Sequence, residues 1–148
     1  MIAVVQRVEK CSVYINKNKY SAIEEGVLVL VGIAHGDNDI DINYIGDKVL
    51  KLRIFSDENK KMNKSVTDIE GEIMLVSQFT LYANCKKGNR LSFIKAEKAE
   101  KAKEIYLRLL DYLKSKYQKI NSGNFQSLMK INLVNDGPVT IIIDSNEK

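Results

Sequence analysis

Two largely apolar runs limit most strongly what this chain can fold into. Residues 26–34 read GVLVLVGIA and residues 72–80 read EIMLVSQFT. Apolar runs of this length without polar alternation predict strands that are buried on both faces of a sheet. The first run is also much shorter than the ~18 apolar residues of a membrane span, so no membrane partner is expected.

Two helices are predicted to pack on the sheet. Between residues 39 and 52, apolar side chains recur every three or four positions, and an aspartate suits the first turn. Residues 97–117 carry a longer apolar stripe with the same period. This second stripe predicts the longest helix of the chain.

Shorter strands are expected elsewhere, a weak one at 20–23 and another short one at 53–55. Residues 1–8 and 12–15 predict a first hairpin, and Asn-Asp-Gly at 135–137 predicts a second between strands at 125–134 and 138–143. Strands outnumber helices without alternating regularly with them. The expected class is therefore α+β, with a mainly antiparallel sheet or open barrel packed by two main helices. Residues 1–148 fit a single domain, with a mobile polar tail at 144–148.

The scarcity of histidine and cysteine excludes several kinds of chemistry. The chain has one histidine, so any Ser-His or Cys-His mechanism would have to use His35. A zinc site needs about four N or S ligands, and Cys11, Cys85 and His35 supply only three, far apart in sequence. We therefore expect no metal and no cofactor. Two isolated cysteines, and an N-terminus without the layout of a signal peptide, favour a cytoplasmic protein.

The second apolar run ends in the polar residues Ser77, Gln78 and Thr80. Polar groups at the end of a buried strand need hydrogen-bond partners or a ligand. Ser77 and Thr80 could act as nucleophiles, but a hydroxyl needs an adjacent base. They could equally cap the strand, and the spacing alone leaves both readings open.

The chain's single proline follows Gly137 at the predicted second turn. A proline at the start of a strand is commonly a turn device. An X-Pro bond can also be cis at a modest cost of roughly 0.5–1 kcal/mol, and a cis bond usually marks a selected feature. The residues alone do not decide between these roles.

A basic window follows the second apolar run. Residues 84–103 hold seven basic and two acidic side chains, a net charge of +5 in a chain whose total is +4. Such a patch suits a phosphate backbone, and it also fits a solvated helix face. Gly88-Asn89-Arg90 within it could be a phosphate-contacting loop or a turn.

Several motifs then occur in an order that gives the chain a specific resemblance. They are VVQRV at residues 4–8, RIFSD at 53–57, Met-Asn at 62–63, SQFTL at 77–81, GNRLSF at 88–93 and GNFQSLMKINLVNDGPVT at 123–140. Together they resemble the D-aminoacyl-tRNA deacylase family, also called D-tyrosyl-tRNA deacylases, over essentially the whole chain. That family usually has proline where this chain has Leu91, which leaves the path of Arg90 and Ser92 open.

The resemblance implies an ester hydrolase that proofreads chirality in translation. Its substrates would be tRNAs charged with D-amino acids, and also glycyl-tRNA, because glycine has no side chain to exclude. The implied catalytic segment is Ser77, Gln78, Phe79 and Thr80. Either the Thr80 hydroxyl forms an acyl-enzyme, or backbone donors near Phe79 and Thr80 polarise the carbonyl while the ribose 2′-OH assists a water. The single histidine favours the second mechanism, because no base is identifiable beside Thr80.

The resemblance also implies a homodimer with two active sites at its interface. Gly137-Pro138, joined by a cis bond, would reach from one subunit into the other's pocket and occupy the space of an L side chain. Arg7 would help to hold this dipeptide. Phe125 and Met129, which are core residues by default, would then line the pocket for the terminal adenine.

The basic window would gain a role as well. Lys86, Lys87 and Arg90 would meet phosphates of the tRNA acceptor stem, so binding should weaken steeply with salt. The rival hypothesis is a non-catalytic nucleic-acid-binding protein that uses the basic surface of residues 84–103.

Overall fold

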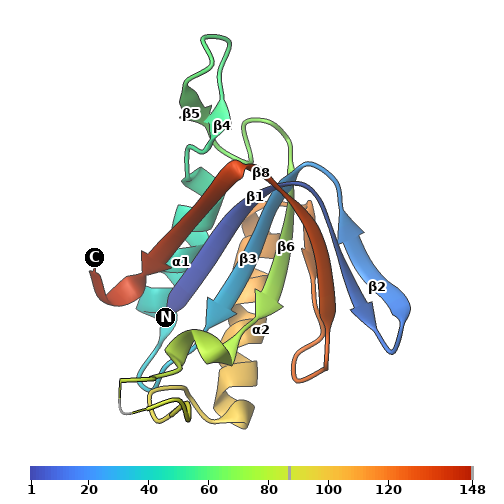
Figure 1. The fold of residues 1–148 in the computed structure, drawn as a ribbon. Helices are drawn as coiled ribbons and strands as arrows, with labels where there is room; N and C mark the ends of the chain where they lie inside the picture. The colour runs from blue at the N-terminus through green and yellow to red at the C-terminus, as the bar shows by residue number, and fades with distance from the viewer. Residues whose placement is uncertain (87, 148) are drawn as a thin grey trace.

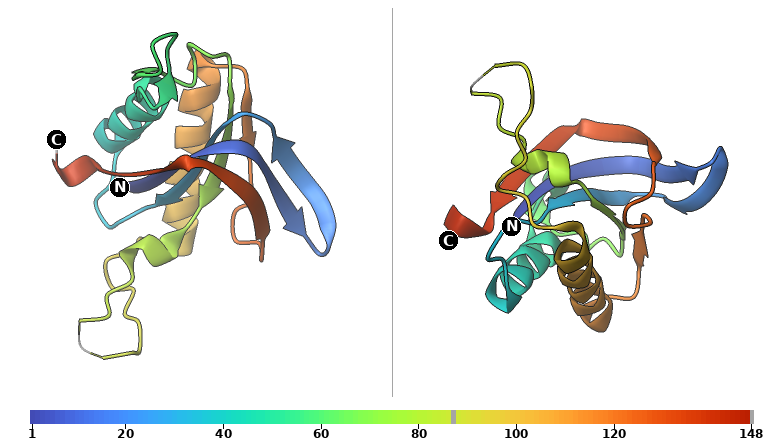
Figure 2. Two further views of the ribbon diagram at one scale, coloured as in Figure 1. Left: turned by 45° about the horizontal axis from the view of Figure 1, so that its top comes forward. Right: turned by 90° about the horizontal axis from the view of Figure 1, so that it is seen from below.

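A curved, mixed sheet carries both helices on one of its faces (Figures 1 and 2). The computed structural model describes residues 1–86 and 88–147. The sheet has six strands in the order β2-β1-β3-β6-β7, with β8 paired to β1. Their bounds are β1 Ile2–Ile15, β2 Asn18–Ile23, β3 Gly26–Gly32, β6 Glu72–Ser77, β7 Ile120–Ser122 and β8 Lys130–Asp144.

The directions of the strands divide this sheet into two parts. β1 is antiparallel to β2, β3 and β8, whereas β6 is parallel to both β3 and β7. A separate small hairpin joins β4 (Phe55–Ser56) to β5 (Met62–Lys64) and projects from the main body (Figure 1). The α+β class with two packed helices is confirmed, and the parallel strands β3 and β6 are the two continuous apolar runs.

The helices are α1 (Asp39–Lys51) and α2 (Ala99–Lys116). α1 begins at a capping box in which the Asn38 side chain accepts from the Ile40 N–H and Asp41 accepts from the Asn38 N–H. As predicted, both helices pack on the sheet, and their apolar stripes share the main core with buried side chains of β3 and β6. Their fully buried members include Ile45 and Leu109.

The predicted N-terminal hairpin is wrong, because β1 runs unbroken from Ile2 to Ile15. Residues 2–8 pair with β3, and residues 11–15 pair with β2. Glu9 and Lys10 are exposed where β1 passes from one partner to the other. The polar interruption in the sequence therefore marks a change of partner strand rather than a turn.

The predicted hairpin at 135–137 is also wrong, because these residues form a bulge within the single strand β8. β8 pairs with β1 on both sides of the irregularity, with Asn135 opposite Val8 and Thr140 opposite Gln6. The side chain of Asn135 closes the bulge by donating to the Arg7 carbonyl at 2.9 Å and to the Val139 carbonyl at 3.0 Å. A bulge needs the same turn-forming residues as a hairpin, so the local sequence does not separate the two.

The segment expected to be a mobile tail is packed at Ser145, which is fully buried. Its hydroxyl accepts from the Met1 ammonium at 2.7 Å, and that ammonium also pairs with Asp37 at 2.7 Å. A short 3-10 helix, η2 (Ser145–Glu147), follows. Lys148 lies outside the described residues.

Candidate active site

The end of β6 is the structural centre of the site. Ser77 is the last residue of β6 and pairs with Val31, and the Gln78 N–H donates to the Val31 carbonyl at 2.7 Å. The chain then turns at once into a short 3-10 helix, η1 (Phe79–Tyr82). The predicted strand therefore ends at residue 77, three residues earlier than expected.

This turn leaves two backbone donors without acceptors. The Leu81 N–H bonds the Gln78 carbonyl, whereas the N–H groups of Phe79 and Thr80 donate no hydrogen bond within the described residues. The first N–H groups of any helix lack partners inside the helix. Phe79 lines a cavity and Thr80 follows it directly, so these two groups remain available to an oxygen atom of a ligand.

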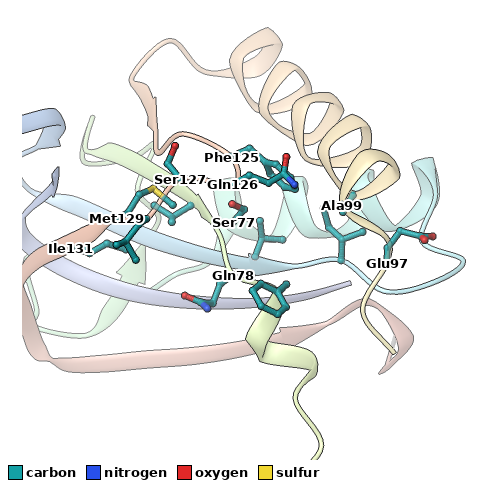
Figure 3. A pocket seen from close by; sticks show the side chains of 15 residues that line it. Ser77, Gln78, Glu97, Ala99, Phe125, Gln126, Ser127, Met129 and Ile131 are labelled. Carbon is teal, nitrogen blue, oxygen red and sulfur yellow. The ribbon is translucent and has the colours of Figure 1, made fainter. Parts of the chain in front are cut away.

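A cavity of about 690 Å³ opens between the end of β6, the start of α2 and the segment before β8 (Figure 3). Ser77, Gln78 and Phe79 line it on one side, and Phe125 and Met129 line it on the other. The structure thus brings together five residues that the sequence places in two distant motifs. Thr80 is exposed at the next position of η1 and is not part of the lining.

Phe125 and Met129 are held in this wall by specific packing. The Phe125 ring lies 5.4 Å from the ring of Tyr106, whose hydroxyl donates to the Leu75 carbonyl at 2.9 Å. Burial raises the pKa of Tyr106, so it remains a neutral donor. A Cβ at Gly123 would lie 2.7 Å from the Met129 sulfur, so only glycine allows this approach. Both residues combine contact with the core and exposure to the cavity.

The hydroxyl of Thr80 has no side-chain base beside it. Its partner in the structure is the Gln78 amide, whose Nε2 donates to Thr80 Oγ1. An amide nitrogen cannot take a proton from a hydroxyl. The only histidine, His35, is paired instead with Glu97 at 2.9 Å, through its Nδ1 atom.

The bulge at Gly137-Pro138 lies away from this cavity and lines no part of it. Gly137 has φ +114°, and its bond to Pro138 is cis. Arg7 lies against the bulge: its Nε is 2.8 Å from Asp136, and a Cβ at Gly137 would lie 2.9 Å from its Nη2. Arg7 also donates to the Ile54 carbonyl at 2.5 Å, so it joins the bulge to the base of the β4–β5 hairpin.

A loop projects beyond η1 (Figure 2). Lys86 and Arg90 are exposed on it, while Lys87 lies outside the described residues. The loop is tied back by the pairing of Asn84 with Ser92 and by the Phe79 ring, which lies 5.0 Å from the ring of Phe93.

Sequence reasoning missed Glu97 and the supporting role of Tyr106. Glu97 lines the cavity at the N-terminal side of α2, and the hydrogen bond from the Lys98 N–H lowers its pKa. Tyr106 belongs to the predicted apolar stripe, but nothing in the periodicity shows that its hydroxyl reaches β6. Within residues 1–86 and 88–147, no three His, Cys, Asp or Glu side chains are grouped to hold a metal ion. None of the described helices is long and apolar enough to cross a membrane.

Comparison with known proteins identifies the family. The family model described as D-Tyr-tRNA(Tyr) deacylase matches residues 4–144. The chain belongs to this deacylase family. A D-aminoacyl-tRNA deacylase from Petrotoga mobilis is 50% identical over 148 residues, covering 99% of both chains. Another from Dictyoglomus turgidum is 48% identical over 147 residues, covering 99% of this chain and 94% of the relative.

Two solved structures share the fold of this deacylase family member. A protein named c-Myc DNA Unwinding Element Binding Protein superimposes with a TM-score of 0.94 at 41% identity, over 98% of this chain and 99% of the other. A probable eukaryotic D-amino acid tRNA deacylase gives a TM-score of 0.82 at 18% identity, over 96% and 97%. The second comparison establishes the shared fold alone.

Proposed function

We propose that the protein hydrolyses the ester that joins a D-amino acid to the 3′-terminal adenosine of tRNA. Membership of the deacylase family supports this reaction class. The observation that carries the assignment to this cavity is the pair of unpartnered N–H groups at Phe79 and Thr80, beside a pocket walled by Phe125 and Met129. An ester carbonyl and an adenine are the groups that such donors and such a wall would bind.

The adenine is placed against Phe125 and Met129 in this proposal. Bases that are not paired stack on aromatic side chains, and a thioether packs well on a flat ring. Tyr106 supports Phe125 from behind, so the ring is already in place before the ligand binds. The ester at the 3′ end of the same nucleoside would then lie toward the end of β6.

The chemical step in this proposal relies on backbone groups and on the substrate. The N–H groups of Phe79 and Thr80 stabilise the negative charge that develops on the carbonyl oxygen as water attacks. The ribose 2′-OH, adjacent to the ester, assists that water. Thr80 Oγ1 accepts from Gln78 and has no base beside it, so it holds the turn rather than acting as a nucleophile.

Stereoselectivity requires a second copy of the chain. Within one chain, neither Gly137 nor Pro138 lines the cavity. The part of the lining at Ser77 is level with Ala3 of β1 through Val31, about 13 Å along the strand from Arg7, beside which the bulge lies. The bulge is exposed on β8, which is an outer strand of the sheet. Ile142, on the same strand, is 71% exposed.

In the proposed homodimer, Gly137-Pro138 of one subunit enters the cavity of the other. Its backbone fills the space that an L side chain would need, while a D side chain points elsewhere. Glycine has no side chain, so the dipeptide does not exclude it, and glycyl-tRNA is a second substrate. Arg7 fixes the dipeptide through its contacts with Asp136 and Ile54.

Lys86, Lys87 and Arg90 are proposed to bind phosphates of the acceptor stem. The loop that holds Lys86 and Arg90 adjoins η1, so it lies near any RNA whose 3′ end occupies the cavity (Figure 2). Counterion release would make this binding strongly dependent on salt. An affinity that does not change between low and high salt would argue against this contact.

Matched D- and L-tyrosyl-tRNA provide the direct test. We expect rapid release of tyrosine from the D-ester, slow release from the L-ester, and release of glycine from glycyl-tRNA. Equal rates for the D- and L-esters would refute the stereochemical proposal. The alternative function is a non-catalytic nucleic-acid-binding protein, and it is favoured by one structural relative, which is named as a binding protein for a DNA element. Tight RNA binding without ester cleavage would support that alternative.

A further inference from the structure

A second cavity adjoins the C-terminal half of η1, whereas the proposed active site adjoins its first residue, Phe79. Its volume is about 790 Å³, which is within the range of small-molecule pockets. Leu81, Tyr82 and Ile94 supply apolar and aromatic lining, and Lys86 and Lys95 supply positive charge. The proposed chemistry uses none of the apolar residues of this lining.

The two cavities share a wall. The segment around Ala96 pairs with the segment after β3: the His35 N–H donates to the Lys95 carbonyl at 3.1 Å, and the Glu97 N–H donates to the Ile33 carbonyl at 2.9 Å. Ile33 and Glu97 line the first cavity, whereas His35 and Lys95 line the second. A chain leaving the first cavity across this wall would enter the second.

The charges of the second cavity favour an anion. Lys86 and Lys95 form no ion pair with any described residue. The one carboxylate of the lining, Asp144, accepts from both the N–H and the side-chain amide of Asn146, each at 2.9 Å. Asn84 uses its carbonyl oxygen to accept from the Lys86 N–H. The lining therefore sets two ammonium groups against one carboxylate, a net charge of +1 above an apolar floor.

We propose that this second cavity binds the nucleotide that precedes the terminal adenosine, which is a cytidine in tRNA. Lys95 contacts the connecting phosphodiester, and the base packs on the apolar floor beside Tyr82. A phosphate on a lysine and a base on an aromatic ring form the usual combination for single-stranded nucleic acid. The inference rests on the proposed function, because it takes the first cavity to hold the terminal adenosine.

The test compares two ligands that differ by this nucleotide. Calorimetry measures the dissociation constants of adenosine and of the dinucleotide CpA for the wild-type protein, Lys95→Ala and the control Lys114→Ala. Lys114 is likewise an exposed lysine, near the C-terminal end of α2. We expect CpA to bind the wild-type protein at least about tenfold more tightly than adenosine, as one hydrogen bond to a charged group would give.

Lys95→Ala should remove most of this gain and leave adenosine binding unchanged, while Lys114→Ala changes neither. The slope of log affinity against log salt for CpA should also fall by roughly 0.7 in Lys95→Ala, the value for one phosphate contact in a single strand. Equal affinities of the wild-type protein for CpA and adenosine would overturn the inference, as would a loss that affects both ligands alike. Because these measurements involve no ester, absence of D-tyrosyl-tRNA cleavage would count against the proposed function alone.

Discussion

Replacing Thr80 with alanine separates the two mechanisms available at the end of β6. The change removes Oγ1, which accepts from Gln78, and retains the backbone N–H of residue 80. The side chain is exposed, so the stability of the fold should change little. If backbone donors and the 2′-OH perform the reaction, we expect kcat to fall by less than about tenfold, or ~1.4 kcal/mol of transition-state stabilisation. Loss of a true nucleophile costs on the order of 10⁶-fold in a serine hydrolase.

The matched change keeps the Thr80 side chain and removes the backbone N–H of residue 80. The α-hydroxy analogue of threonine, incorporated at position 80, puts an ester oxygen where the N–H was. We expect this variant to lose roughly 10²–10³-fold, as for removal of one oxyanion donor. The assay is single-turnover release of D-tyrosine from D-tyrosyl-tRNA at saturating enzyme, with thermal unfolding as a check on folding. Abolished turnover in Thr80→Ala, with turnover preserved in the hydroxy-acid variant, would refute the backbone mechanism.

Three further changes test the structure around the site. Asp37→Asn removes the negative charge that pairs with the buried Met1 ammonium, so urea unfolding should show a loss of about 3–5 kcal/mol; an unchanged midpoint would contradict the buried ion pair. Gly123→Ala displaces Met129, so steady-state kinetics should show a several-fold rise in KM with little change in kcat. Burial raises the pKa of Cys11 from 9.0 to about 11, so the folded state favours the neutral thiol and loses stability as pH rises between these values. Urea unfolding at pH 8 and pH 10.5 should show that loss, and Cys11→Ala should reduce it.

The central elements could be predicted because their signals are local. Burial on both faces gives β3 and β6 continuous apolar runs, and the stripe around Ile45 or Leu109 has the period of a helix. β1 and β8 could not be predicted as single strands. At Glu9 and at Asn135 the local sequence reads as an interruption, and only the distant partner strand shows that the ladder continues.

The candidate site likewise combines residues that could be predicted with features that could not. The resemblance assigned Ser77 and Phe125 to one pocket, and the fold brings them together, although no periodicity links them. The register of β1 against β3 and β8 could not be predicted from the sequence. The separation of the bulge from the cavity depends on which residues of β1 face β3 and β8. Cavities are likewise made by packing, so the second one has no signature in the chain.

The position of the bulge outside the lining of its own subunit's cavity has a genetic consequence. In the proposed dimer, each working centre combines a pocket from one copy with a filter from the other, so two differently damaged copies can complement each other. A subunit altered at Gly137 keeps its pocket, and a subunit with a blocked pocket keeps its bulge. Mixed dimers of the two would recover one stereoselective centre out of two, whereas neither parent dimer would have any.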